Sequence, residues 1–125
     1  MFSDTITFTD IIGTTDWTLT RINQDGYSSE YLLRDSLFEV RLTLKNITYT
    51  DKKRNVLIDR HTAQLTCTIF PVSPAVLGTV RKTYAVFEVQ QGDTMSSAVA
   101  VATGLMNFLG ATAGANLTKM ANFES

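Results

Sequence analysis

The sequence predicts an α+β domain in which an antiparallel β-sheet is followed by α-helices. Residues 38–45 and 61–70 alternate apolar and polar side chains with a period of two. In a strand, this alternation places the two kinds of side chain on opposite faces. Residues typical of turns separate these stretches from their neighbours. After residues 92–93 (Gly-Asp) the apolar period lengthens to that of a helix.

A chain of 125 residues is expected to form one domain with a substantial core. We expect this domain to span residues 1–125, with a β-hairpin in 1–24, the main antiparallel sheet in 27–91 and two helices in 94–122. The N-terminus lacks the basic region and apolar stretch of a signal peptide. The single Cys67 cannot form an intrachain disulfide, and the alternation around it predicts a small core residue.

The N-terminal third contains short β-rich runs separated by turns. Residues 5–12 and 15–22 flank a Gly-Thr pair at 13–14, which predicts a hairpin. The Asp-Gly pair at 25–26 is a strong turn signal. Residues 27–34 fit either a short strand or a helical turn, and the pattern leaves both open.

The stretch 37–50 is the strand around which the rest of the sheet is expected to be arranged. It has an apolar face and a polar face, formed respectively by Phe38, Val40, Leu42 and Leu44 and by Glu39, Arg41, Thr43 and Lys45. Residues 51–55 predict a hairpin tip, and the return strand runs to Phe70. The return strand again has an apolar side, which includes Cys67, and a polar side rich in threonine.

Two prolines interrupt the sheet pattern in residues 71–78, because proline lacks the donor that a ladder needs. This apolar loop either packs on its own domain or meets neighbouring subunits in an assembly. Residues 79–91 predict a third long strand.

The C-terminal region is expected to be helical and carries no charge from Thr94 to Thr118. The first helix is expected to begin at Asp93 or Thr94 and to end at Gly110, and a second to span residues 113–122. Its apolar side chains would cover the apolar face of the sheet. A membrane span needs about 20 predominantly apolar residues. Glycines and polar residues interrupt this run, so we expect no membrane partner.

The basic residues are concentrated in the middle of the chain, although the formal net charge is −1. Residues 41–82 contain eight basic and two acidic side chains, and the remainder contains three basic and ten acidic ones. This distribution fits a surface for a polyanion and also fits a solvated sheet face.

No pattern of catalytic residues is present, and we expect neither an enzyme nor a small-molecule substrate. One histidine, His61, and one cysteine do not make a zinc site, so no metal or other cofactor is expected. The sequence has no nucleophile elbow and no phosphate-binding glycine loop.

The order of elements resembles that of the coat proteins of single-stranded RNA bacteriophages, the leviviruses. The shared order is a hairpin, three long antiparallel strands, a proline-containing loop before the last strand, and two helices. The likeness is strongest where Phe38 precedes Leu44 and Lys45, and where the run Lys82-Thr83-Tyr84 precedes Glu88. It covers essentially the whole chain by element order.

The resemblance implies an intertwined homodimer with one continuous sheet, in which each chain's helices cover the partner. An uncharged helix fits such an obligate interface, which resembles a protein core. Dimers would build a quasi-equivalent icosahedral shell, expected to be T=3, with the loop 71–78 at the symmetry axes and the hairpin 5–22 outside. The protein would then be found in the virion, after assembly in the cytoplasm of a bacterial host.

The resemblance also implies that the inner, polar face of the sheet binds the RNA genome and an operator hairpin, and so represses replicase translation. Tyr84 matches a tyrosine that stacks on an unpaired base. The predicted RNA-binding residues lie on three strands and at the hairpin tip: Arg41, Thr43, Lys45, Lys52, Lys53, Arg54, Thr66, Thr68, Tyr84 and Glu88. Basic groups would contact phosphate and make affinity depend on salt.

Two departures from the family pattern affect specificity. Val86 stands where a polar RNA contact is expected, and residues 47–61 are longer than usual, with a basic tip. Two other functions remain as alternatives to the coat protein. One is a β-sheet RNA-binding regulatory dimer that does not assemble, and the other is a small membrane-associated β protein.

Overall fold

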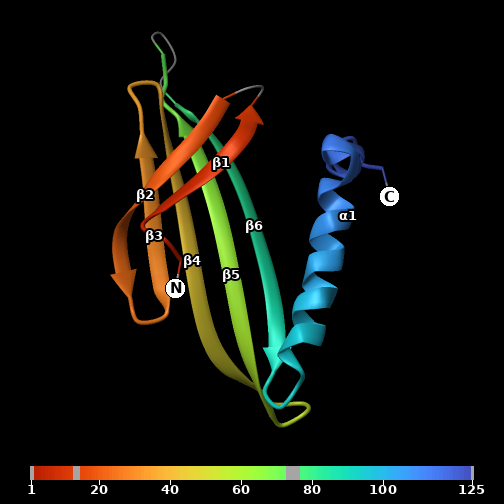
Figure 1. Ribbon diagram of the computed structural model, residues 1–125. Helices are drawn as coiled ribbons and strands as arrows, with labels where there is room; N and C mark the ends of the chain where they lie inside the picture. The colour runs from red at the N-terminus through yellow and green to blue at the C-terminus, as the bar shows by residue number, and fades with distance from the viewer. Residues whose placement is uncertain (1, 13–14, 73–76, 125) are drawn as a thin grey trace.

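The computed structural model describes residues 2–12, 15–72 and 77–124. Within these residues it has one six-stranded antiparallel sheet, with the strands in sequence order, and one helical element (Figure 1). The elements are β1 (Thr5–Ile12), β2 (Thr15–Asp25), β3 (Ser28–Arg34), β4 (Phe38–Asp51), β5 (Val56–Ile69), β6 (Thr79–Gln90) and α1 (Met95–Ala121). The predicted α+β meander is therefore present.

Most of the predicted connections can be compared with the structure. Residues 27–34, for which the sequence allowed a strand or a helical turn, form the strand β3 after a turn at Gly26. The predicted tip at residues 51–55 joins β4 to β5. The predicted turn at 13–14 and residues 73–76 of the predicted loop lie outside the described part of the chain.

The three long strands pair with a continuous register. On β4 and β5 the pairs run from Phe38 opposite Ile69 to Asp51 opposite Val56. On β5 and β6 they run on from Ile69 opposite Thr79. Because directly opposed residues of an antiparallel pair project from the same face, the alternation within each strand extends across all three.

The core lies where the β1–β2 hairpin folds over the apolar face of β4 and β5 (Figure 1). Its buried residues come from β2, β3, β4 and β5, and they are Trp17, Leu19, Tyr31, Val40, Leu42 and Cys67. A register shift between Arg21 and Asn23 marks an irregularity in β2. Such bulges increase the local bend and twist of a strand, which helps the sheet to curl onto itself.

Arg21 holds the N-terminal segment against this curled sheet. Its guanidinium pairs with Asp4 at 3.0 Å, donates to the Tyr31 hydroxyl at 2.9 Å and lies 5.4 Å from the centre of the Tyr31 ring. The Tyr31 hydroxyl in turn donates to the Ser3 carbonyl oxygen at 2.8 Å. These contacts fix Phe2 beside the open part of the apolar face.

The C-terminal region is helical, as predicted, and a break divides it into two regular parts. It is one helical element, α1, in which residues 111–114 leave helical geometry and Thr112 and Ala113 adopt positive φ. Gly114, with φ of +84°, tolerates that conformation without strain. The break falls where the sequence predicted the first helix to end.

Within the described chain, α1 does not cover the apolar face of its own sheet. No residue of α1 is buried, and the helix stands beside the sheet after leaving the end of β6 (Figure 1). Within the chain, the hairpin supplies the cover, because the curl of the sheet brings Trp17 within 6.0 Å of Phe38, ring to ring.

By length and composition alone, α1 could cross a membrane, with a mean hydropathy of 1.4. A single helix of this kind is weak support for a span. The regular part from Met95 to Gly110 is shorter than the roughly 20 residues that a bilayer requires. Irregular backbone at residues 111–114 would also leave polar groups unpaired in hydrocarbon.

Candidate nucleic-acid interface

Seven of the ten predicted RNA-binding residues lie on one face of the sheet. The register places Arg41 opposite Thr66 and Thr43 opposite Gln64, which is itself opposite Tyr84. By the same alternation, this polar face includes Arg41, Thr43, Lys45, Thr66, Thr68, Tyr84 and Glu88. The structure therefore assembles side chains from three strands into one surface, which we call the polar face.

Tyr84 is the most exposed aromatic side chain of the polar face, with 65% of its surface accessible. It projects from β6, which lies at the edge of the sheet. Beside it, the Gln64 amide donates to the Thr66 hydroxyl at 3.3 Å. An exposed aromatic ring beside amide and hydroxyl groups can stack on a base and contact its edge.

The charges of the polar face are unevenly balanced. Arg41 pairs with Glu30 at 3.3 Å and with Glu39 at 3.8 Å, so neighbouring carboxylates offset its charge. In the described part of the chain, Lys45 and Lys82 form no ion pair. These two lysines are the groups of this face best placed to contact phosphate.

The basic tip lies beyond the end of the polar face, where Arg54 Nη1 donates to Gln90 Oε1 of β6 at 3.5 Å. Lys52, Lys53 and Arg54 follow the end of β4, and Asp51 is six positions along the strand from Lys45, or about 20 Å away. Arg54 pairs with Asp51 at 3.0 Å, and this contact holds the pKa of the Asp51 carboxyl below its ordinary 3.8. The Lys53 amide also donates to Asp51, so the turn is well ordered by hydrogen bonds.

The predicted set of RNA-binding residues leaves out several members of the polar face, and the basic region of the sequence includes one residue that lies elsewhere. Lys82, Gln64, Thr62, Arg60 and Tyr49 share the face by register. Alternation within each strand places them on this face, but it does not say which residues of the face contact RNA. Arg81, counted in the basic region, instead projects from the apolar face opposite Cys67 and lines a hollow with Trp17 and Phe38.

Glu88 is tied to neighbouring strands. Its carboxylate accepts a hydrogen bond from the Tyr49 hydroxyl and lies 3.8 Å from the Arg60 guanidinium. Any RNA contact by Glu88 would compete with these two partners.

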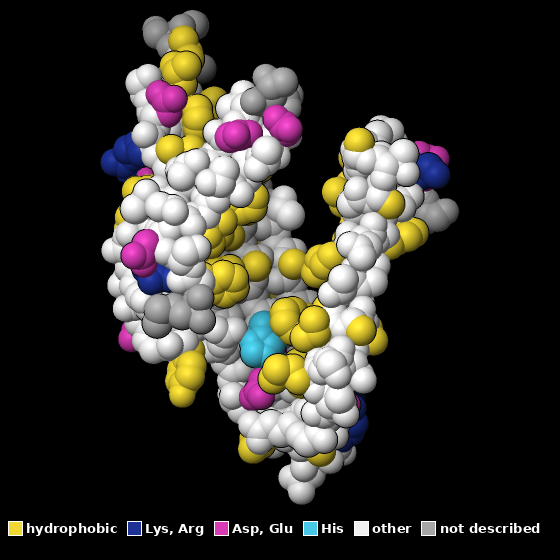
Figure 2. All heavy atoms as spheres, in the orientation of Figure 1, with side chains coloured by type: hydrophobic (Ala, Val, Ile, Leu, Met, Phe, Trp, Pro, Cys, Tyr) yellow, Lys and Arg dark blue, Asp and Glu magenta, His cyan; other side chains and the backbone are white. Residues whose placement is uncertain are grey.

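The opposite side of the sheet is hollowed between the hairpin and α1, and apolar side chains gather there (Figure 2). We call this hollow of about 370 Å³ the apolar groove; its lining includes Phe2, Leu44, Ala63, Ala85, Phe87 and Met106. Met106 comes from α1, and Phe2 from the segment that Arg21 fixes. None of these lining side chains is fully buried within the described chain, and Phe2 is 61% exposed.

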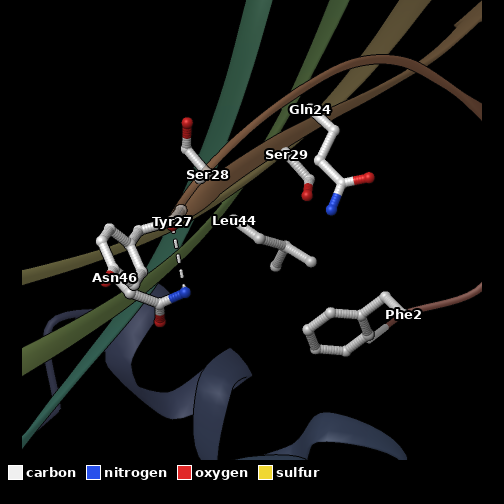
Figure 3. A pocket seen from close by; sticks show the side chains of 8 residues that line it. Phe2, Gln24, Tyr27, Ser28, Ser29, Leu44 and Asn46 are labelled. Carbon is white, nitrogen blue, oxygen red and sulfur yellow. Dashed lines mark hydrogen bonds between the residues drawn. The ribbon is translucent and has the colours of Figure 1, made fainter.

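The apolar groove continues toward the β2–β3 turn, where Phe2 and Leu44 are joined by polar groups (Figure 3). There the Asn46 amide donates to the Tyr27 carbonyl oxygen at 3.1 Å. His61 Nδ1 lies 2.7 Å from Asn46 Oδ1, and its ring is 4.9 Å from that of Phe87. His61 is thus a hydrogen-bonded residue of the groove wall. Among the described residues, no cluster of three potential metal ligands occurs.

The fold is shared with a solved virus-like particle protein. The chain is similar to the protein in the virus-like particle of Beihai levi-like virus 21, with a TM-score of 0.66 and 24% sequence identity. The similarity covers 94% of this chain and 90% of that one. The two chains therefore share the same fold. A comparison with curated protein sequences gives no match.

A family model for the coat protein of phage phiCb5 matches residues 3–90, which is more than half of the chain. The chain belongs to this family of phage coat proteins. It is a structural, non-enzymatic protein of the virion, as the resemblance to single-stranded RNA phage coat proteins implied.

Proposed function

We propose that this coat protein forms an intertwined homodimer, that dimers assemble into an icosahedral shell, and that the polar face binds the RNA genome inside it. The observation that carries the proposal is the unfinished apolar side of the molecule. An apolar helix with no buried residue stands beside an apolar groove, although hydrophobic burial is the main force in folding and association.

A second copy would cover both features at once. In the described residues, β6 pairs with β5 and with no other strand, so its second edge remains available. Pairing of β6 with β6 of a second copy would give one continuous sheet and remove this edge. Each helix α1 would then lie along the apolar groove of the other copy.

The arrangement of the two sides favours RNA on the polar face. The hairpin and α1 both lie on the apolar side, which leaves Tyr84, Lys45 and Lys82 uncovered. Lysines contribute salt-dependent phosphate binding, and Tyr84 contributes stacking. We propose that this surface faces the shell interior and also binds an operator hairpin to repress replicase translation. The basic tip would contact packaged RNA.

The shell proposed is a T=3 particle with the hairpin outside and the loop 71–78 around the symmetry axes. The proposal is tested by expressing the full chain in bacteria and examining it by size-exclusion chromatography and electron microscopy. We expect particles tens of nanometres across that contain host RNA and protect it from nuclease. A protein that remains a soluble dimer while binding RNA would instead support the regulatory alternative.

A matched pair of variants separates assembly from RNA binding. Replacement of Lys45 and Lys82 by Gln should reduce the RNA content of the particles but preserve the dimer, because these side chains lie on the polar face. Replacement of Arg81, which projects from the opposite face of the sheet, by Gln serves as a control with the same change of charge per residue. Unchanged RNA content in the first variant would contradict RNA binding by this face.

A further inference from the structure

Beyond Tyr84 on the polar face, three side chains from three strands meet: Tyr49 of β4, Arg60 of β5 and Glu88 of β6. The Arg60 guanidinium carbon lies 5.1 Å from the centre of the Tyr49 ring. Arg60 Nη2 lies 3.8 Å from Glu88 Oε2, and the Tyr49 hydroxyl donates to the same oxygen. The carboxylate therefore holds both of its neighbours.

The register explains why these three residues meet. Arg60 is directly opposite Ile47 on β4 and Glu88 on β6. Tyr49 is two residues beyond Ile47 on the same face, so it lies on the diagonal from Arg60, a distance that long side chains reach. Ile58 sits directly opposite Tyr49 and is only 4% exposed, which gives the ring a packed neighbour.

The hydrogen bond to Glu88 raises the pKa of Tyr49 above its ordinary 10.0. The hydroxyl therefore stays protonated and remains a donor at neutral pH. A cation over an aromatic ring is attracted by the ring quadrupole, and this adds to the ion pair that orients Arg60. The guanidinium is thus held by two contacts, one with the Tyr49 ring and one with the Glu88 carboxylate.

Arg60 nevertheless keeps 44% of its side-chain surface exposed. Glu88 partly offsets its charge, so Arg60 should attract a phosphate group less strongly than a lysine with no carboxylate nearby. Its planar group can still provide a stacking surface, because unpaired RNA bases stack on arginine planes as well as on aromatic rings. The Arg60 guanidinium therefore offers an exposed plane on which an RNA base can stack.

We propose that Arg60 is a second stacking position for a base of single-stranded RNA, with Tyr49 and Glu88 as positioning residues. This inference rests on the proposed binding of RNA by the polar face. Glu88 is four residues from Tyr84 on the same strand face, about 13 Å away, so the two positions hold different nucleotides of one strand. In this role Glu88 orients Arg60 and does not itself contact RNA.

The test compares Arg60→Ala with Arg60→Lys in the full-length protein. The probe is a short single-stranded RNA that carries 2-aminopurine, whose fluorescence falls when the base stacks. Both variants should bind at least about 5-fold more weakly and show less quenching, since a stacked base is worth about 1–3 kcal/mol. Arg60→Lys should keep the wild-type dependence of affinity on salt, because it keeps the charge.

Wild-type affinity and quenching in Arg60→Lys would overturn the proposal, because Arg60 would then act only as a charge. Tyr49→Phe and Glu88→Gln test positioning. Each should reduce the quenching in the wild-type background and have no further effect in Arg60→Ala. Additive losses in Arg60→Ala would overturn the positioning roles, because the two residues would then act independently of Arg60.

Tyr84→Ala distinguishes a failure of the Arg60 proposal from a failure of the proposed RNA binding by the polar face. If Tyr84→Ala weakens binding and Arg60→Ala does not, the second stacking position is wrong and the RNA-binding face stands. If neither change alters RNA affinity, both are wrong. Elution of each variant at the wild-type volume shows that a loss does not come from misfolding, which is expected for substitutions at partly exposed positions.

Discussion

The hairpin β1–β2 and the helix α1 both lie on the apolar side of the sheet, and they are in opposite situations. The hairpin buries Trp17 and Leu19 against β4 and β5. The helix has no buried residue, and Val101 is 77% exposed. The hairpin therefore completes the core of its own chain, whereas the apolar side chains of α1 stay exposed.

The difference follows from how each element joins the sheet. β2 is hydrogen-bonded to β3, so the curl of the sheet carries the hairpin back over β4. α1 follows a turn at Gly92, whose φ of +95° directs the chain out of β6, and no ladder draws the helix back. One half of the apolar face is therefore covered locally, and within the described chain the other half stays open.

The largest expected effect comes from a change in the hairpin. Leu19 is fully buried, and Leu19→Ala should lower the free energy of unfolding by about 2–5 kcal/mol because it leaves a cavity. Urea denaturation at a fixed protein concentration measures the change. Val101→Ala on α1 is the control. In the monomer it should lower the free energy of unfolding by less than about 0.5 kcal/mol, because this side chain is exposed. Equal losses in dilute, monomeric protein would contradict the difference between the two regions.

A charge on the helix should affect association more than folding. Leu105 is 55% exposed in the single chain, and its burial by a partner would be worth about 1.5–3 kcal/mol for each copy. Leu105→Asp should therefore shift dimers toward monomers in sedimentation equilibrium, and Leu105→Met should not. Association of Leu105→Asp at wild-type strength would show that this side of α1 is not an interface.

The polar face offers a third comparison, because its binding of RNA should not depend on substitutions in the hairpin or in α1. Tyr84→Ala should weaken binding to a cognate RNA hairpin by about 1–3 kcal/mol through loss of stacking, and should leave the dimer intact. Filter binding and sedimentation measure the two properties separately. Val86→Ala on the same strand face is the matched control. If it weakens binding as much as Tyr84→Ala does, stacking is not the cause.

The smallest expected effect is a dependence of stability on pH, and it comes from the turn between β4 and β5. Because Arg54 holds the pKa of Asp51 below its ordinary 3.8, this contact stabilises the fold above that value. The contribution is lost as the pH falls through the lowered pKa of the folded state. Asp51→Asn should therefore lower the denaturation midpoint at neutral pH and have little effect once the carboxylate is protonated. An equal effect at both pH values would exclude this ion pair as the cause.

The local pattern of the sequence determined much of the fold. Alternation in residues 38–45 and 61–70 assigned the apolar and polar faces, and the structure confirms both. The change of period after Gly92 predicted the helical region, and Gly110 marked the end of its first regular part. These features were predictable because strand and helix periods are properties of consecutive residues.

Tertiary structure alone decided which element covers which face and which distant side chains meet. The covering hairpin depends on the curl of the sheet, and the contact of Tyr49, Arg60 and Glu88 depends on the register of three strands. Arg81 shows the same limit, since it belongs to the basic region in sequence and to the apolar face in space. Register and curl arise from turns, bulges and packing between residues far apart in the chain, so no single local stretch specifies them.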